Sequence, residues 1–257
     1  MTTANPPAGG QRERSAMSIP GSTEILGYAH RLGWSRTLAR GLYVAANQLA
    51  TVSILDCFHL RREDINTALT NAGGQYECRF LAPPEMIPVA DRCEAPLNRI
   101  LHEAVARGDA AYAIFDGPRL ASIGLYAERP TPIMTDLVVS FDPPERYMYR
   151  GYTLPDYRGQ RLHALGILRA ALELFDRDVP QLVTVCERTN YPATISVLRM
   201  GWQPSGTIYR VGIGPWVRLG QTARARSIGM HLRRRDANSA DRSDISACSA
   251  SPGTSCR

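Results

Sequence analysis

Residues 147–175 form the segment whose residue types could do chemistry. They read YMYRGYTLPDYRGQRLHALGILRAALELF, which predicts a short strand, a Pro-Asp-Tyr-Arg-Gly turn and an apolar helix. Backbone N–H groups in the first turn of a helix have no partners inside it, and the helix dipole adds partial positive charge at the same end. The segment therefore predicts an anion site, where the main chain holds a pyrophosphate and Arg158 and Arg161 supply charge.

This segment resembles the acetyl-CoA-binding motif of the GNAT acetyltransferase superfamily, in which an apolar strand is followed by V-x-P-x-Y-R-G-x-G-x-G/A and a helix. A second similarity follows in CERTNYPATISVLRMGW, residues 186–202, which is similar to the family's strand end, N-x-x-A helix and G-F/W ending. Arg161 and His163 depart from the motif, because they stand where it has small loop residues. The matching loop positions are Thr153, Pro155, Tyr157, Arg158 and Gly159.

The resemblance implies acetyl-CoA or another acyl-CoA as co-substrate, and no metal. The thioester carbonyl would lie against the end of the strand, and the phosphates on N–H groups of residues 159–164. Asn190 is similar to a family asparagine that contacts the pantetheine arm, and a helix cap is a second, compatible role for it. The implied cofactor-binding residues are Tyr152, Thr153, Arg158, Gly159, Gln160, Arg161, Leu162, His163, Ala164 and Asn190.

The implied reaction needs a base that takes a proton from the amine and an acid that protonates the departing thiolate. Glu145 is the first candidate for the base, since some histone-type members place a catalytic glutamate on this strand; the alternative is a charge at the strand edge after two prolines. Glu128 is a second candidate, on the implied acceptor side. Val197 stands where many members have a tyrosine acid, so Tyr191 is a candidate substitute, with Tyr209 as another.

Composition and periodicity divide the chain into four parts. A helical pattern over about 23–50 and a strand pattern over 51–60 are expected to pack against or cover the core. Alternating and helical patterns then predict strand, helices, three strands, helix, strand, helix and strand over about 75–215, with a hairpin at Asp116-Gly117. The predicted parts are a disordered N-terminus (1–22), a helix and strand extension (23–74), a GNAT-like acyltransferase domain (75–222) and a disordered Arg-rich tail (223–257).

These patterns predict an α/β (α+β) fold, a GNAT-like mixed and mainly antiparallel sheet flanked by helices, with an N-terminal helical extension. The chain has 257 residues, 44% of them hydrophobic, which is enough for a real core. Six cysteines without metal-ligand spacing suggest neither a zinc site nor a disulfide framework, so a cytoplasmic protein is expected. No signal peptide or membrane span is predicted.

Three functions are compatible with the sequence. The first is an N-acyltransferase, with acetyl as the expected group and a small-molecule or peptide amine as acceptor. The second is a non-catalytic acyl-CoA-binding or scaffold protein with a degenerate site. The third is binding of nucleic acid or an anionic surface through residues 221–257, where seven Arg against three Asp give +4; the tail has no aromatic residue to stack on bases, so nucleic acid is not favoured. The resemblance is also compatible with a homodimer.

Overall fold

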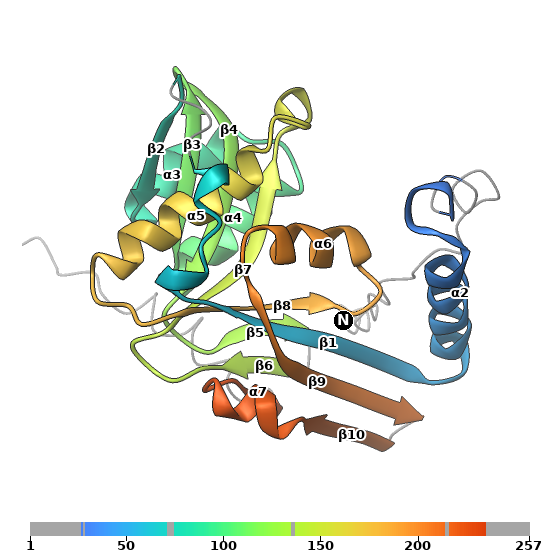
Figure 1. Cartoon of the computed structure of the whole chain (residues 1–257). Helices are drawn as coiled ribbons and strands as arrows, with labels where there is room; N and C mark the ends of the chain where they lie inside the picture. The colour runs from blue at the N-terminus through green and yellow to red at the C-terminus, as the bar shows by residue number, and fades with distance from the viewer. Residues whose placement is uncertain (1–26, 28, 71–74, 135–136, 214–215, 235–257) are drawn as a thin grey trace, which may run out of the picture.

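An eight-stranded sheet organises the protein, for which a computed structural model describes residues 27, 29–70, 75–134, 137–213 and 216–234 (Figure 1). Across the sheet the strand order is β10-β9-β1-β8-β7-β4-β3-β2. Strands β7 and β8 pair in parallel, and the other neighbours pair antiparallel. The strands are β1 (Thr51–Leu60), β2 (Glu77–Leu81), β3 (Ala110–Asp116), β4 (Arg119–Ala127), β7 (Arg146–Thr153), β8 (Leu182–Glu187), β9 (Gln203–Ile213) and β10 (Trp216–Gln221).

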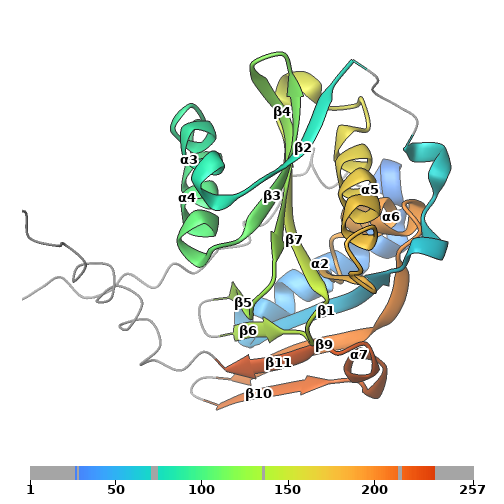
Figure 2. The same cartoon turned by 90° about the vertical axis from the view of Figure 1, so that its left-hand side faces the viewer.

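Helices cover both faces of the sheet, so the predicted fold class, a mixed and mainly antiparallel sheet flanked by helices, is confirmed. Figure 2 shows α3 (Pro83–Asp91) and α4 (Leu97–Arg107) on one face, and α5 (Leu162–Phe175) and α6 (Tyr191–Arg199) on the other. Leu101 of α4 is fully buried on its side, and Leu168 of α5 is fully buried on the opposite side. Apolar helix faces pressed on both sides of a sheet are the usual way to bury it.

The predicted helix and strand patterns between residues 75 and 213 correspond to observed elements, with two additions. A second sheet of order β11-β6-β5 contains β5 (Thr131–Met134), β6 (Leu137–Ser140) and β11 (His231–Arg234). The expected disorder does not begin at residue 223, because residues 223–234 form α7 (Ala223–Ser227) and β11. Ala225 and Met230 are fully buried in one cluster with Cys57 and Val183, which explains why this arginine-rich stretch is ordered. The disorder predicted for 1–22 and 235–257 falls outside the described residues.

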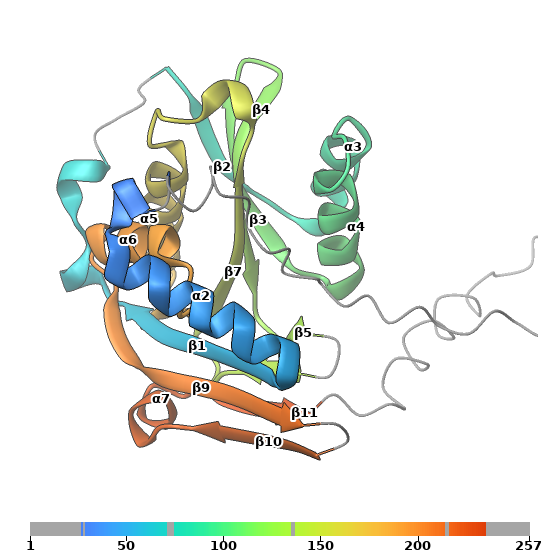
Figure 3. The ribbon, with the colours of Figure 1, turned by 90° about the vertical axis from the view of Figure 1, so that its right-hand side faces the viewer.

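The N-terminal strand β1 was expected to pack against or cover the core. The structure instead places it inside the main sheet. It lies between β8 and β9, with Leu60 opposite Leu182 on one side and Ile54 opposite Tyr209 on the other. The preceding helix α2 (Trp34–Leu49) runs alongside β1 and α6 (Figure 3), and its Tyr43 hydroxyl accepts a hydrogen bond from the backbone of Ile54 (3.4 Å). The predicted division between 23–74 and 75–222 therefore does not separate two folding units.

We predict that a chain that begins at residue 61 will not fold cooperatively. Without β1, strands β8 and β9 both lose their shared neighbour, and the partners of the buried Cys57, Phe58 and Leu60 are exposed. Far-UV circular dichroism and urea unfolding of the full and shortened chains measure this. A cooperative unfolding transition in the shortened chain would contradict the placement of β1.

Glu145 lies just before β7 in a buried polar pair. Its carboxylate accepts a hydrogen bond from the side chain of Gln181, and its second oxygen has no partner among the described residues. Only 9% of Glu145 is exposed. Burial is the main cause that raises the pKa of this carboxyl to about 7, partly offset by the bond from Gln181.

This raised pKa predicts a pH-dependent stability. The folded state holds the proton of Glu145 more tightly than the unfolded state, so its favourable contribution is present below the ordinary pKa of 4.5 and is lost as pH rises toward about 7. Glu145→Gln removes this loss. Its free energy of unfolding relative to the wild type should rise by about 1 to 3 kcal/mol between about pH 4.5 and pH 8. Urea unfolding across this range measures the difference, and a difference that stays constant with pH would show that Glu145 is solvated.

Candidate active site

The candidate site begins where β7 and β8 separate. Parallel pairing joins Arg146 to Leu182 and Tyr147 to Val183, and no later residue pair joins the two strands. Beyond this point the facing backbone groups need other partners. Thr184 supplies one, because its hydroxyl donates to the carbonyl of Met148 across the opening (2.7 Å). The two strands therefore diverge like the sides of a V toward their C-terminal ends.

A bulge in β7 accompanies this divergence. Leu125 of β4 is opposite Arg150 and Tyr126 is opposite Met148, which leaves Tyr149 as an extra residue on β7. A bulge bends its strand and increases the local twist, so β7 turns away from its neighbour here. The bulged strand and the early end of pairing thus produce the same opening.

Tyr149 is held firmly by a buried polar network. Its hydroxyl donates to the carboxylate of Asp109 (2.8 Å) and accepts from the guanidinium of Arg107 (2.6 Å). Arg107 also bonds to Asp109 (2.8 Å), whose side chain is 3% exposed. Burial and the nearby Asp109 raise the pKa of Tyr149, so this phenol stays protonated at neutral pH. The network anchors the bulge and leaves the phenol without an acid or base role.

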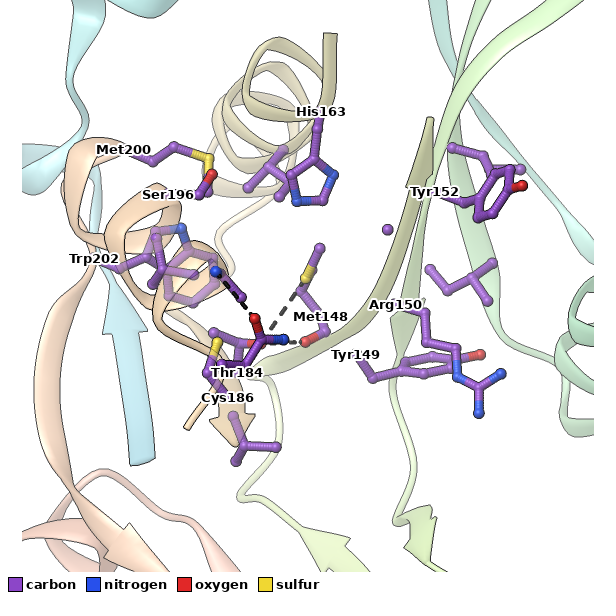
Figure 4. Close-up of a pocket in the computed structure, with 18 of the residues that line it drawn as sticks. Met148, Tyr149, Arg150, Tyr152, His163, Thr184, Cys186, Ser196, Met200 and Trp202 are labelled. Carbon is purple, nitrogen blue, oxygen red and sulfur yellow. Dashed lines mark hydrogen bonds between the residues drawn. The ribbon is translucent and has the colours of Figure 1, made fainter. Parts of the chain in front are cut away.

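A cavity of about 400 Å³ fills the opening between the strands. Figure 4 shows Tyr149, Arg150 and Tyr152 on one wall, and Met200 and Trp202 on the opposite wall. The indole N–H of Trp202, which is buried, has no hydrogen-bond partner among the described residues. The α4 side of the cavity is apolar and is formed by Leu97, Ile100, Leu101, Ile123 and Leu125.

The first turn of α5 lies at one end of this cavity. Helical bonding begins with Leu165, which donates to the carbonyl of Arg161 (3.1 Å), so the N–H groups of Leu162, His163 and Ala164 have no partner inside the helix. No side chain caps this helix start. Gly159 and Arg161 both have left-handed backbone conformations, with φ of 83° and 61°. The start of α5 therefore presents three backbone N–H groups without a partner inside the helix, and the left-handed arginine costs about 1 kcal/mol.

Side chains from neighbouring elements fix the loop before α5. Tyr157 of the loop donates to Asp116 (3.0 Å) at the end of β3. Tyr76, just before β2, donates to Gln160 of the loop (2.6 Å). Arg158 donates through Nε to the carbonyl of Thr153 (3.3 Å), which keeps its guanidinium beside the loop. The N–H groups of the loop are therefore oriented before any anion binds, which reduces the entropic cost of binding.

His163 points from α5 into the cavity rather than toward solvent (Figure 4). Its ring lies directly over Gly151 of β7, so close that a Cβ on residue 151 would meet ring atom Cε1 at 2.1 Å. A glycine at 151 and a histidine at 163 therefore depend on each other. Burial lowers the pKa of His163 below its ordinary value, which keeps the imidazole neutral at neutral pH.

The structure brings together only part of the predicted binding set. Tyr152, His163 and Asn190 line the cavity, and Asn190 also caps α6 by accepting from the backbone of Ala193 (3.4 Å). Residues 158–164 form the adjacent helix start. Thr153 does not line the cavity; its hydroxyl pairs with that of Ser122 (2.9 Å).

None of the predicted catalytic residues lines the cavity. Glu145 lies beyond the closed end of the V, and Glu128 forms an exposed ion pair with Arg146 (2.9 Å) at that same end. Tyr191 begins α6 with its ring under the guanidinium of Arg36 (5.4 Å). Glu145 precedes β7 and Glu128 follows β4, so both lie at the end where β7 pairs with β8, away from the cavity. The structure instead places Glu187 in the wall, at the end of β8, where its position beside the N-x-x-A helix was the available signal.

Neither a metal-binding cluster nor a membrane-spanning helix is found in the described residues. In residues 27, 29–70, 75–134, 137–213 and 216–234, no three His, Cys, Asp or Glu side chains are grouped to hold a metal ion. No helix in these ranges is long and apolar enough to cross a membrane.

Comparison with known proteins finds solved structures that resemble the fold of this chain. No family model matches the chain, and no curated protein matches it. Similar solved structures include a tandem GNAT protein from the clavulanic acid biosynthesis pathway, with 16% identity and a TM-score of 0.44 over 70% of this chain and 58% of that chain. A GCN5-related N-acetyltransferase from Kribbella flavida has 16% identity and a TM-score of 0.43 over 69% of this chain and 66% of that chain.

A GNAT-family acetyltransferase from Colwellia psychrerythraea has 10% identity and a TM-score of 0.43 over 68% of this chain and 62% of that chain. The match therefore spans less than two thirds of each of these three chains. Similarity of this degree carries no argument about activity or substrate.

The contact between His163 and Gly151 predicts a strong coupling in stability. Gly151→Ala should lower the free energy of unfolding by about 1 to 3 kcal/mol, because the added methyl group forces the imidazole out of its place. In a His163→Ala background the same change should cost much less. Urea unfolding of the four proteins measures the coupling, and equal costs in both backgrounds would place the imidazole elsewhere.

Proposed function

We propose that the protein is an N-acyltransferase that transfers an acyl group, with acetyl as the first candidate, from acyl-CoA to the amine of a small molecule or peptide. One observation carries the proposal: the cavity between β7 and β8 is lined by His163, which lies in the first turn of a helix whose start has no side-chain cap. An acyl-CoA has the matching shape, with a pyrophosphate at one end of a thin arm and a thioester at the other. The residues present fit this co-substrate, although His163 narrows the passage between the two ends.

The chain's groups divide the work of binding. The N–H groups of residues 162–164 and the guanidinium of Arg158 would hold the phosphates. Backbone groups of β7 beyond the bulge, freed by the end of pairing with β8, would bond to the arm and polarise the thioester carbonyl. Such a site consists mainly of backbone donors, which every residue except proline provides.

In this proposal the α4 side of the cavity receives the acceptor or a longer acyl chain. Its lining of Leu97, Ile100 and Ile123 is apolar, so the group bound there is expected to present carbon rather than charge. Arg150 of β7 is exposed and is a charged residue in the lining of the cavity. The amine attacks the thioester directly in this proposal, and no covalent enzyme intermediate forms.

A non-catalytic acyl-CoA-binding protein is the second candidate. The observation that favours it is that Glu145, Glu128 and Tyr191 all lie away from the cavity, while Val197 in its wall cannot donate a proton. Both candidates bind acyl-CoA, so binding tests what they share and turnover separates them.

We predict that acetyl-CoA and free CoA bind the wild-type protein in isothermal titration calorimetry. Arg158→Ala should weaken both by about three- to tenfold, because one charged contact to phosphate is lost. Arg99→Ala is the matched control: Arg99 is also an exposed arginine, on α4, and pairs with Glu103 (3.8 Å), so its loss should leave binding unchanged. Absence of heat with either ligand, or equal weakening by both variants, would contradict the proposed site.

A further inference from the structure

His163 lies where its imidazole can exchange a proton with a molecule bound in the cavity. It lines the cavity between the diverging strands, in van der Waals reach of the backbone of Gly151. No described residue forms a hydrogen bond or ion pair with either of its ring nitrogens. His163 is half-buried, and neither of its ring nitrogens is among the buried side-chain atoms without a hydrogen-bond partner, so solvent in the cavity reaches them. The ring is therefore available to a bound molecule.

The other titratable and charged groups that line this cavity come from β7 and β8. For two of these groups the pKa moves away from neutral pH: burial raises the pKa of Cys186 to about 11 and also raises that of Tyr149, so neither exchanges a proton near neutral pH. Burial lowers the pKa of His163, so its imidazole is neutral and can accept a proton. These groups are Tyr149, Arg150 and Tyr152 on β7, and Cys186 and Glu187 on β8; α4 and α6 contribute no charged side chain to the lining.

We propose that His163 is the catalytic base and acid of this site, an inference that rests on the proposed acyltransferase function. Its free ring nitrogen takes a proton from the acceptor ammonium, which leaves the neutral amine to attack. A bond forms between the amine nitrogen and the acyl carbon as the bond from that carbon to sulfur breaks. The imidazolium then returns a proton to the departing thiolate, while the amide nitrogen loses its second proton to solvent. The products are an amide and free CoA thiol.

This assignment accounts for one departure from the GNAT-like motif. His163 stands at a loop position where the motif has a small residue, and the strand residue that it covers is Gly151, whose missing side chain leaves room for the imidazole in the cavity. It also supplies the proton carrier that Glu145, Glu128, Tyr191 and Val197 do not supply.

The test uses the full-length protein with acetyl-CoA as donor, and water and ethylamine as acceptor probes. Water is always present, so a base beside the thioester should produce measurable release of CoA. His163→Gln should lower turnover by about 100-fold or more, while the dissociation constant of acetyl-CoA changes less than about threefold. The wild-type rate should rise with pH through the lowered pKa of His163 and then level off, and His163→Gln should lose that rise.

His59→Gln is the matched control. His59 is a partly buried histidine on β1 whose pKa is also lowered by burial, but its ring pairs with Ser205 (2.5 Å) and it does not line the cavity. This variant should keep both the rate and the pH rise. Glu187→Gln should keep the pH rise as well, which separates the imidazole from the carboxylate in the same wall.

A second measurement uses the wild-type protein and does not depend on turnover or on a variant that folds. Diethyl pyrocarbonate modifies accessible imidazoles, and mass spectrometry locates the modified residues. Acetyl-CoA should slow modification of His163 several-fold and leave that of His59 unchanged.

The outcomes separate this inference from the function on which it rests. No binding of acetyl-CoA in calorimetry overturns the acyltransferase proposal and this one with it. Binding together with an unchanged rate and pH profile in His163→Gln, or no wild-type turnover above background, overturns the role of His163 alone. A tenfold gain in affinity on loss of the imidazole would overturn it too, because the ring would then obstruct the passage.

Discussion

The candidate site depends on the short parallel pairing of β7 with β8. Two residue pairs join these strands, and beyond Tyr147 and Val183 the sheet opens. The bulge at Tyr149 turns β7 away, and the buried Asp109–Arg107 pair fixes the bulge by holding the tyrosine hydroxyl. Thr184 then bonds across the opening to Met148, which satisfies a carbonyl that a regular sheet would have paired. The opening is therefore tied across at its closed end, while backbone groups of β7 beyond the bulge have no partner on β8.

Strand β8 forms the opposite wall and is supported by β1. Strand β8 would be an edge strand beyond the opening, but β1 from the N-terminal part of the chain pairs along its whole length. Just after the C-terminal end of β8, Arg188 donates to the carboxylate of Asp56 (2.6 Å), which also accepts from Thr207 (3.1 Å), so β1 and β9 are joined to the chain that leaves β8. The same β1 carries α2 to the side of α6 (Figure 3). Strand β8, which lines the cavity, is thus held by a strand that lies more than a hundred residues earlier in the chain.

Local patterns predicted most of the elements but not their partners. The helix α5 follows from its apolar stripe, and the β3–β4 hairpin follows from the Asp-Gly turn, because both depend on neighbours within a few residues. Alternation also predicted a strand at 51–60, but period-two patterning does not say which strands lie beside it, so its place between β8 and β9 was not foreseen. The helix-start residues of the site could be predicted, since they are contiguous. His163 over Gly151 could not, because that contact depends on how far α5 lies from β7, and the positions of Glu145 and Glu187 depend on which end of the sheet opens.

Hydrogen–deuterium exchange with and without CoA would test the central claim most directly, since it maps where the ligand bonds to the backbone. The account predicts slower exchange in two places that are separate in sequence: the amides of residues 159–164 at the start of α5, and those of β7 after the bulge at Tyr149. Edge strand β10 and helix α3, which lie away from the cavity, should not change. Protection confined to other segments, or none at saturating CoA, would contradict the claim that the opening between β7 and β8 and the start of α5 form one binding site.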